Sequence, residues 1–384
     1  MKRFLLCGAI ASLAITACEQ PAVEVSTPVL QPRRVLSVTD AQVVMSGLDN
    51  PRGLAFGPDG ALYVAQAGRG GSGPCFQVMQ TVCYGPTGSV GRLWKGTQDT
   101  VVTGLPSYAS DLGRAEGPNS VAFHGMGGAY VGVGFESDPR NRAGVPQLAG
   151  FASLVHVPAT AFVRGKANPR SKVDWQFVED LGAYEVAVNP DCGRIDSNPF
   201  SVRAVPGGVI IVDAGANALI RRDANGELTT FAAFTSRYTT PQGSHCPAVA
   251  PNTLPAETVP TSIVVGPDGA FYVGQLAGFP VVVGGAQIFR VVPGEAPTVA
   301  YTGFTFVISL AFDAFDNLYV LQHVTGPGAN ATGSLVRVTP GGNRTTIING
   351  LIRPTSIAID TDGAIYISHR GTSAGTGEVL RIRP

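Results

Sequence analysis

The sequence predicts an all-β protein, a six-bladed β-propeller, because a hairpin pattern recurs along the chain and the composition suits many short strands. In residues 259–273, two runs of β-branched and aromatic residues flank Gly-Pro-Asp-Gly, the residue types of a tight turn. Close variants begin at Pro51, Pro118, Pro199, Val307 and Pro354. The chain has 49 Gly and 29 Pro but only 14% charged residues, which is typical of short strands joined by turns.

The first 40 residues predict export and a lipid anchor. Met1, Lys2 and Arg3 precede an apolar run over 4–14, and the following Ile-Thr-Ala-Cys predicts a lipoprotein signal, residues 1–17, with Cys18 lipidated. Residues 18–40 contain several prolines and no apolar period, so we expect a lipid-anchored flexible tether. The expected location is the bacterial cell envelope, facing the periplasm or the exterior, with the membrane reached through the lipid. The alternative is an ordinary secretory signal, with Cys18 incidental and the protein secreted.

The propeller is predicted over 41–384, with its ring closed by the N-terminal strand. Repeats four to six have a third strand at 287–291, 335–338 and 379–382, and repeats four and five a fourth at 298–301 and 345–348. The chain ends before the sixth repeat can form its fourth strand. Residues 41–48 resemble 344–351, which close the fifth repeat, and are expected to supply the missing strand.

The spacing of the hairpin turns predicts three insertions. Asp59, Gly127, Gly207, Asp268, Asp316 and Asp362 lie 68, 80, 61, 48 and 46 residues apart. A plain blade takes roughly 40 to 50 residues. The excess is assigned to insertions at about 68–89, 135–196 and 235–258, which lie outside the hairpins, where functional loops are expected.

Four cysteines lie in these insertions: Cys75, Cys83, Cys192 and Cys246. In an exported chain they predict two disulfides, and Cys75–Cys83 with Cys192–Cys246 is the favoured pairing because the first closes a short loop. A cysteine metal site is the alternative, although His245 is the only histidine beside these cysteines.

The ordered motifs at 48–75, 83–88, 197–200, 212–217, 273–280 and 303–305 resemble the ScyD/ScyE family, which is similar to NHL/TolB-like propellers. The resemblance runs from about residue 47 to the C-terminus. It implies the propeller fold and an exported location but little chemistry. Gln66 stands where the family commonly has Glu, and Ala216 where it commonly has Gly, so an acidic role at position 66 is in doubt.

A candidate site is predicted where the first strands of the blades begin and the second strands end, on one face beside the channel. Glu116, Asn119, Asn198 and Asp213 offer oxygen ligands that suit calcium. The other polar residues expected on this ligand-binding face are Asn50, Arg52, Asn217, Gln275, His323, Arg353 and His369. The alternative is that a wet channel mouth simply collects polar side chains.

Two classes of function remain open. Lys and Arg equal Asp and Glu at 27 each, so no global field would attract nucleic acid. His-Glu-x-x-His and phosphate-loop motifs are absent, and no catalytic residue can be named. The favoured function is therefore a non-catalytic binding or scaffold protein for a protein, glycan or small molecule. The alternative is a calcium-dependent lactonase or related hydrolase, which requires three oxygens of the calcium set to converge.

Overall fold

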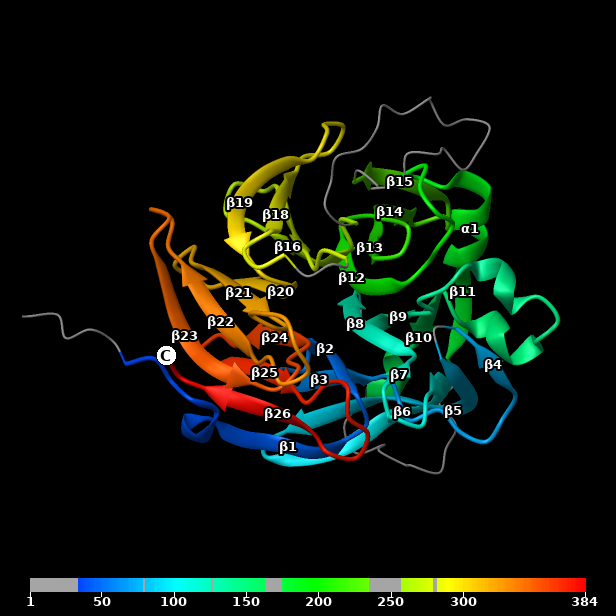
Figure 1. Cartoon of the computed structure of the whole chain (residues 1–384), viewed down its shortest axis with the longest axis horizontal. Coiled ribbons are helices and arrows are strands. Elements are labelled where there is room, and N and C mark those ends of the chain that lie inside the picture. Colours follow the sequence, from blue (N-terminus) through cyan, green and yellow to red (C-terminus); the bar gives the residue numbers. More distant parts are fainter. Residues whose placement is uncertain (1–33, 79, 126, 163–174, 235–256, 279–281) are drawn as a thin grey trace, which may run out of the picture. The chain divides into compact units, whose positions relative to one another are not determined.

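Each copy of the hairpin pattern forms the two inner strands of one antiparallel sheet, with alternate side chains packing against the neighbouring sheet. The computed structural model describes residues 34–78, 80–125, 127–162, 175–234, 257–278 and 282–384. Its propeller unit spans Val35–Pro384. Six antiparallel sheets stand in a ring, so the predicted six-bladed β-propeller is confirmed (Figure 1).

In the first three blades, the four main strands follow one another along the chain from the innermost strand outward. Blade 1 contains β2 (Pro51–Phe56), β3 (Leu62–Gln66), β5 (Thr81–Trp94) and β6 (Thr97–Ala109). Short β4 (Cys75–Gln77) pairs with β5, and β7 (Ala115–Glu116) pairs with β6. Blade 2 contains β8 (Pro118–His124), β9 (Gly128–Val133), β10 (Ser153–Val157) and β11 (Gln176–Asp180). Blade 3 contains β12 (Pro199–Val205), β13 (Gly208–Asp213), β14 (Ala218–Asp223) and β15 (Leu228–Ala233).

The last three blades follow the same order, except that the outermost strand of blade 6 comes from the N-terminal part of the chain. Blade 4 contains β16 (Pro260–Val265), β17 (Phe271–Gln275), β18 (Ala286–Val291) and β19 (Thr298–Phe304). Blade 5 contains β20 (Val307–Phe312), β21 (Leu318–Gln322), β22 (Gly333–Val338) and β23 (Arg344–Leu351). Blade 6 contains β24 (Ser356–Ile359), β25 (Ile365–His369), β26 (Gly377–Ile382) and β1 (Gln42–Leu48).

Helices are short in the described part of the chain. They are α1 (Leu181–Val188) and the 3-10 helices η1 (Val38–Asp40), η2 (Pro139–Arg142), η3 (Pro146–Gly150) and η4 (Ala159–Phe162). Among the described residues, none of these helices has the length and apolar character needed to cross a membrane.

The N-terminal strand closes the ring as the sequence predicts. Strand β1 pairs antiparallel with β26, placing Met45 opposite Val379 and Leu48 opposite Gly377. Met45 and Leu48 are buried and pack with side chains of blade 1. The first and last blades are thus joined both by backbone hydrogen bonds and by a shared apolar cluster.

A tyrosine near the start of the second strand packs against the next blade around the ring. The aromatic pairs are Tyr63 with Phe123, Tyr272 with Phe312, and Tyr366 with Phe56, with ring centroids 4.7, 5.3 and 5.5 Å apart. Tilted and edge-to-face aromatic pairs add about 0.5 to 1.5 kcal/mol beyond their buried area. The repeated Tyr of the hairpin therefore contributes to the blade interfaces.

The predicted insertions differ in part from what the structure contains. Strands β10 and β11 lie within 135–196 and complete blade 2, so that segment is not wholly an insertion. Within 68–89, β4 and the first half of β5 form a hairpin that extends blade 1. Most of the third segment, 235–256, lies outside the described residues. The blade strands were missed because they do not repeat the Pro-Asp-Gly signal that marks the inner hairpins.

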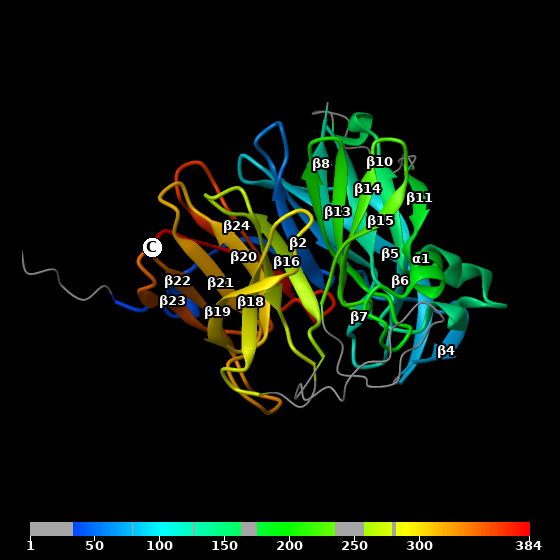
Figure 2. The same ribbon diagram turned by 90° about the horizontal axis from the view of Figure 1, so that it is seen from above.

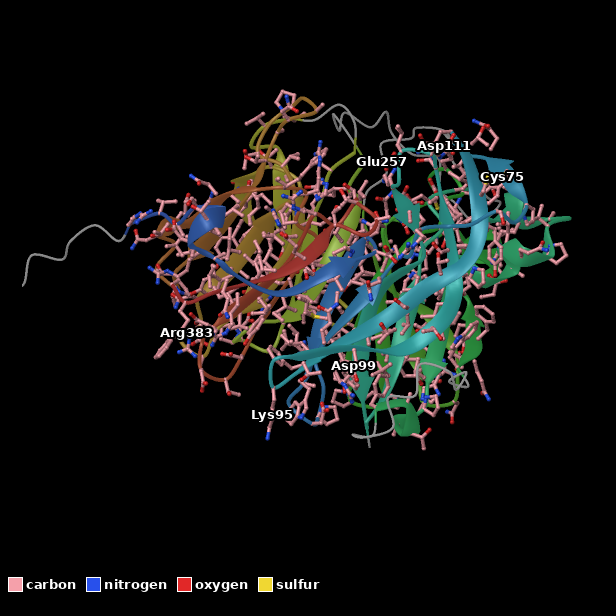
Figure 3. The ribbon with its side chains drawn as sticks, turned by 90° about the horizontal axis from the view of Figure 1, so that it is seen from below. Cys75, Lys95, Asp99, Asp111, Glu257 and Arg383 are labelled. Atoms are coloured by element: carbon pink, nitrogen blue, oxygen red, sulfur yellow. A yellow bond between two sulfur atoms is a disulfide. The ribbon has the colours of Figure 1, made fainter. Side chains whose placement is uncertain are left out.

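We call the face at which the innermost strands begin the top face. Figure 2 shows the ring from the side, with β4 and β7 at this same face. In Figure 3, Cys75, Asp111 and Glu257 lie on the top face, whereas Lys95 and Asp99 lie at the opposite one. Cys75 and Glu257 belong to the first and third predicted insertions, so both of these insertions have described residues on the face that carries the predicted site.

Candidate functional site: the top face and the central channel

The top face carries a recurring hydrogen bond at the end of the second strand. In blades 1, 5 and 6, and through Asp213 in blade 3 as well, the polar side chain that ends this strand accepts the backbone N–H of the segment leading into the innermost strand. The pairs are Gln66 Oε1 with Asp49 N at 2.9 Å, Gln322 Oε1 with Thr305 N at 2.7 Å, and His369 Nε2 with Ile352 N at 2.9 Å. Gln275 Oε1 instead accepts from Gln287 N of the third strand at 2.9 Å. These acceptor atoms stabilise the blades.

Asn50 and Arg353 lie in the segments before two innermost strands, with positive φ angles of 51° and 43°. Asn50 is fully buried, and its Nδ2 donates to the carbonyl oxygens of Gly68 at 2.9 Å and Gly113 at 3.0 Å. Arg353 donates to the carbonyl oxygen of Ala329 at 3.0 Å. Both residues therefore shape the connection between blades as well as the predicted ligand-binding face.

The two predicted histidines are held by the fold. Because Nε2 of buried His369 accepts a backbone N–H, its Nδ1 carries the proton and donates to Glu378 Oε2 at 3.0 Å. His323 Nδ1 lies 2.8 Å from the carbonyl oxygen of Pro354. Burial, the largest cause, lowers the pKa of His323 to about 4 and lowers the pKa of His369 as well. Both rings are thus neutral at pH 7.

Asp213 ends β13, and hydrogen-bond donors of its own blade surround it. Its Oδ1 accepts the N–H groups of Asn198 at 2.6 Å, Gly215 at 3.1 Å and Ala216 at 3.1 Å. Its Oδ2 accepts the Ser197 hydroxyl at 2.6 Å. Complete burial raises the pKa of Asp213 to about 6, although the hydrogen bonds oppose this shift. The partners of this carboxylate are therefore backbone and hydroxyl donors.

Three of the four candidate calcium ligands meet beside Gly134. A Cβ atom there would lie 2.3 Å from Asn119 Nδ2, 2.3 Å from Asn198 Oδ1 and 3.1 Å from Glu116 Oε2. Asn119 Nδ2 donates to Asn198 Oδ1 at 3.2 Å. Within the described part of the chain, Glu116 Oε2 and Asn119 Oδ1 are buried without a hydrogen-bond partner. Glycine at 134 leaves room for this convergence.

Two arginines neutralise the acids around this point. Arg52 donates to Glu116 Oε1 at 3.1 Å and to the carbonyl oxygen of Ala115 at 2.7 Å. Arg114 donates to Glu136 Oε2 at 2.6 Å and lies 3.5 Å from Glu116 Oε1. Burial and the neighbouring Glu136 raise the pKa of Glu116 to about 7, against the lowering effect of both guanidinium groups. The network carries two positive and at most two negative charges.

The predicted calcium set is therefore brought together only in part. Asp213 is engaged by its own donors, while one carboxylate and two amides converge at Gly134. No three His, Cys, Asp or Glu side chains among the described residues are placed to hold a metal ion. The nearby guanidinium groups of Arg52 and Arg114 disfavour a divalent cation at this point by charge repulsion.

Asn217 lies between two carboxylates at the top of blade 3. Its Oδ1 accepts the N–H of Val259 at 2.8 Å, so Nδ2 must donate, and it does so to Asp191 Oδ2 at 2.8 Å and Glu257 Oε2 at 3.0 Å. Burial, the largest cause, raises the pKa of Asp191 to about 6. Asn217 therefore cross-links the end of β13 to the segment before β16.

Sequence reasoning missed Glu185, a fully buried acid on α1. Its Oε1 accepts the N–H of Asp196 at 3.4 Å, and its Oε2 has no hydrogen-bond partner among the described residues. Burial raises its pKa to about 9, and the neighbouring carboxylates of Asp213 and Asp191 add to the shift. The available signal was a single acid in an otherwise apolar helix, Leu-Gly-Ala-Tyr-Glu-Val-Ala-Val.

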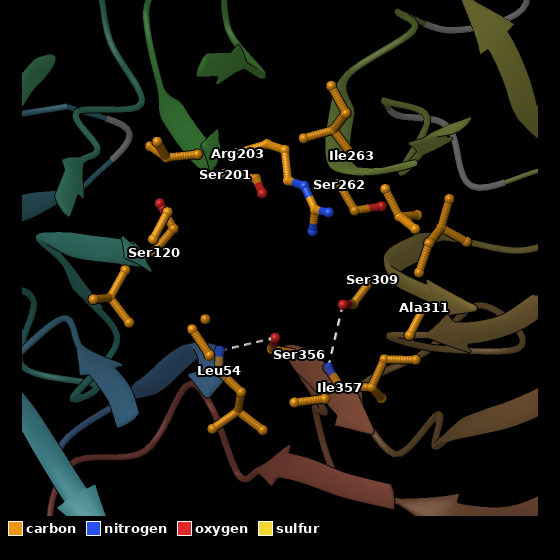
Figure 4. A pocket seen from close by; sticks show the side chains of 18 of the residues that line it. Leu54, Ser120, Ser201, Arg203, Ser262, Ile263, Ser309, Ala311, Ser356 and Ile357 are labelled. Carbon is orange, nitrogen blue, oxygen red and sulfur yellow. Dashed lines mark hydrogen bonds between the residues drawn. The ribbon is translucent and has the colours of Figure 1, made fainter. Parts of the chain in front are cut away.

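The central channel runs between the innermost strands of all six blades and encloses about 570 Å³ (Figure 4). Val121, Ile263 and Ile357 and the serine before each of them are all largely buried and line the channel. The serines occupy equivalent positions in five blades and are Ser120, Ser201, Ser262, Ser309 and Ser356, with Gly53 in blade 1. The channel also contains Arg203, which the sequence analysis did not single out.

A serine motif between β25 and β26 is not a hydrolase nucleophile elbow. Residues 371–375 have the spacing Gly-x-Ser-x-Gly. In hydrolases of that type the serine sits on a turn between a strand and a helix. Here the segment follows β25 and leads through turns into strand β26. Residues 371–375 therefore have the Gly-x-Ser-x-Gly spacing but not the strand-to-helix turn of a nucleophile elbow.

The predicted local disulfide is present. Cys75 on β4 is bonded to Cys83 on β5, where the two residues face each other in antiparallel register. Cys192 is also disulfide-bonded. Its predicted partner, Cys246, lies outside the described residues, as does Cys18.

The fold and this channel define a six-bladed propeller with a hollow axis, and known proteins share that architecture. No protein-family model and no curated protein matches this sequence. The PQQ-bound aldose sugar dehydrogenase of Streptomyces coelicolor is 12% identical, with a TM-score of 0.52 over 88% of this chain and 96% of that chain. A protein of unknown function from Bacteroides thetaiotaomicron is 11% identical, with a TM-score of 0.52 over 90% of this chain and 73% of that chain. At such identities the likeness shows the fold alone.

Proposed function

We propose that this protein is an exported, lipid-anchored propeller of the ScyD/ScyE type that binds a small solute in its central channel without transforming it. The channel carries the proposal, since all six blades bound about 570 Å³ of open space. Sites for small molecules are typically concave spaces of roughly 300 to 1,000 Å³. The blade interfaces around this space are closely packed with buried side chains.

The hydrogen bonds of the top face favour binding over catalysis. Asp213, His369 and Gln322, which end second strands, use their acceptor atoms to stabilise the blades. A general base needs an acceptor within reach of a reacting proton, and these atoms are directed into the protein. The channel itself is lined from the third residue of each repeat onward, away from these top-face groups.

Export and anchoring are proposed from the sequence. The Ile-Thr-Ala-Cys run at 15–18 supports lipidation, and the ordered motifs from 48 to 305 support the ScyD/ScyE assignment. A cell-envelope location would expose the channel to solutes of the periplasm or of the surroundings.

Retention of a solute tests the proposed function. The purified full-length protein is incubated with the small-molecule fraction of a culture, desalted and denatured, and the released compounds are identified by mass spectrometry. We expect at least one compound to be retained by the natural protein and lost from Ala311→Trp, which fills the channel. Ala296→Trp places the same side chain on an exposed turn and is the matched control. Equal retention by all three proteins would refute the channel as the binding site.

The alternative, a calcium-dependent lactonase or related hydrolase, is favoured by one observation: two oxygens of the predicted calcium set, Glu116 Oε2 and Asn198 Oδ1, converge at Gly134, where Asn119 presents its Nδ2. Calorimetric titration of the metal-free protein with calcium chloride tests this alternative. Heat of binding that is lost in Glu116→Gln and kept in Asp362→Asn, an exposed turn variant, would support a calcium site. No heat of binding would leave the solute-binding function as the one supported.

A further inference from the structure

We infer that the central channel binds the oxyanion of a small organic acid or phosphate ester through Arg203. This inference names the ligand class for the proposed function and rests on it. Figure 4 shows the Arg203 side chain leaving β12 and pointing into the open centre of the channel, beside Ser201. Three features of Arg203 support this ligand class: its position in the blade, its lack of a partner and the Ser201 hydroxyl beside it.

Arg203 breaks the pattern of the other five blades. Counting from the first residue of the repeat, its position is occupied by small apolar residues elsewhere: Ala55, Ala122, Val264, Ala311 and Ala358. These residues line the channel together with Arg203. The fold can therefore be built with alanine or valine at this position, and an arginine is not required for packing.

The charge of Arg203 has no counterion in the described part of the protein. Of the 24 residues that line the channel, it is the one charged residue, and the described structure gives it no hydrogen bond and no salt bridge. Surrounding protein lowers the pKa of Arg203 through desolvation. The side chain of Arg203 is exposed to the channel and carries its charge in water, so an anion that enters the channel gains a charge-assisted interaction with it.

The serine hydroxyls are divided between the two halves of the channel. Ser309 accepts the N–H of Ile357 at 3.2 Å, and Ser356 accepts that of Leu54 at 3.0 Å, so these two link neighbouring blades. Within the described residues, the hydroxyls of Ser120 and Ser262 are buried without a hydrogen-bond partner, and Ser201 is half-buried with no hydrogen bond from its hydroxyl. These three belong to blades 2, 3 and 4, the half of the ring centred on Arg203. Of the three, the half-buried Ser201 lies beside Arg203 and can donate to a solute there.

These features favour a small molecule that has an oxyanion group and a short apolar remainder. A guanidinium presents a planar fork that binds carboxylate or phosphate through two parallel hydrogen bonds, and a serine hydroxyl can donate a third. The alanines and the valine at the same level offer an apolar wall to the rest of the solute. Carboxylate and phosphate share this recognition, so the test must separate them.

Calorimetry of the purified full-length protein with benzoate, phenyl phosphate and neutral benzamide tests the inference. We expect one or both anions to bind and benzamide to bind at least about tenfold more weakly, as for a lost charged hydrogen bond. Arg203→Gln should weaken the anions about 10- to 100-fold and leave benzamide unchanged. Arg203→Lys keeps the charge but loses the planar fork, so its affinity for the anions should lie between those of the natural protein and Arg203→Gln. Arg383→Gln removes the same charge from an exposed C-terminal position and should have no effect.

The outcomes separate this inference from the proposed function. Binding of benzoate alone assigns a carboxylate, and binding of phenyl phosphate alone assigns a phosphate ester. If benzamide binds as well as the anions and Arg203→Gln alters none of them, the inference fails while solute binding in the channel stands. If an extract solute is retained in the channel but neither anion binds at millimolar concentration, the inference also fails. Chemical unfolding of each variant checks that lost binding is not lost folding.

Discussion

Four hydrogen bonds hold the Asp213 carboxylate, and they predict a structural effect of its substitution. Asp213→Asn keeps the shape but removes the charge that Asn198, Gly215, Ala216 and Ser197 stabilise. We expect the free energy of unfolding to fall by about 1 to 3 kcal/mol at pH 7.5, irrespective of calcium. Denaturant unfolding of both proteins, once with added calcium and once with a chelator, measures this change in the free energy of unfolding.

Asp362→Asn, at an exposed hairpin turn, is the matched control for Asp213 and should change stability little. A loss of stability for Asp213→Asn that appears only in the presence of calcium would contradict the structural role. It would instead assign the carboxylate to a metal.

Glu185 predicts a pH dependence of stability. Its pKa is raised to about 9 in the folded protein from an ordinary value of 4.5, so the folded state keeps a proton that the unfolded state releases. The stability that this proton contributes is fully present below about pH 4.5 and is lost as the pH rises through about 9. Glu185→Gln should therefore be more stable than the natural protein at pH 8, by an amount that grows by at most about 1.4 kcal/mol per pH unit.

Unfolding curves of both proteins at pH 5 and pH 8 check this dependence. The stability difference between them isolates Glu185, because His323, with a pKa lowered to about 4, changes stability in the opposite direction in both proteins. Glu295→Gln, on an exposed turn, should show no such gain. A Glu185→Gln variant that is less stable than the natural protein at pH 8 would show that an ionised Glu185 has a partner.

At the scale of one element, a polar residue at the end of a strand can use its hydrogen bonds to stabilise its own blade, which leaves fewer of them for a ligand. Gln66, Gln322 and His369 all accept a backbone N–H from the segment before the innermost strand. Their positions could be read from the repeat, since they follow the Leu-Tyr-Val type strand. The direction in which these side chains point could not be predicted from the sequence, because it depends on where the backbone that leads into the innermost strand lies.

Strand β1 gives the prediction at this scale. Deleting residues 41–48 leaves β26 as an unpaired edge and removes Met45 and Leu48 from the cluster shared with blade 1. We expect a large loss of thermal stability and aggregation through the exposed edge. Differential scanning calorimetry and light scattering measure the two effects.

Two point variants on β1 control for the deletion. Met45 is buried, whereas Val43 on the same strand is 48% exposed. Met45→Asp should cost at least about 3 kcal/mol, because it removes an apolar side chain and buries a charge, while Val43→Asp should cost little. Equal stability of the deletion variant and the natural protein would refute β1 as the closing strand.

At the scale of the whole molecule, the sequence repeats made the six-bladed ring predictable. They did not reveal which residues meet in the channel or on the top face. Six similar hairpins and the match of 41–48 to 344–351 determine the blade count and the closure. Arg203 could be found only by aligning the repeats position by position, because it is conspicuous only beside the alanines of the other blades. The meeting of Glu116, Asn119 and Asn198 joins blades 1, 2 and 3, so it depends on the packing angle between sheets and not on any spacing in the chain.

The lipid anchor predicts where the whole molecule resides. Lipidation requires the Cys18 thiol, and each buried methylene of an acyl chain adds about 0.8 kcal/mol, so several chains hold a protein firmly on a membrane. Cys18→Ala should therefore move the protein from the membrane fraction to the soluble periplasmic or secreted fraction and abolish labelling by a fatty-acid analogue. Cys7→Ala, in the apolar run of the signal, is the matched control and should leave both unchanged. Membrane association of Cys18→Ala at the level of the natural protein would mean that another part of the chain, or a membrane partner, holds the propeller in place.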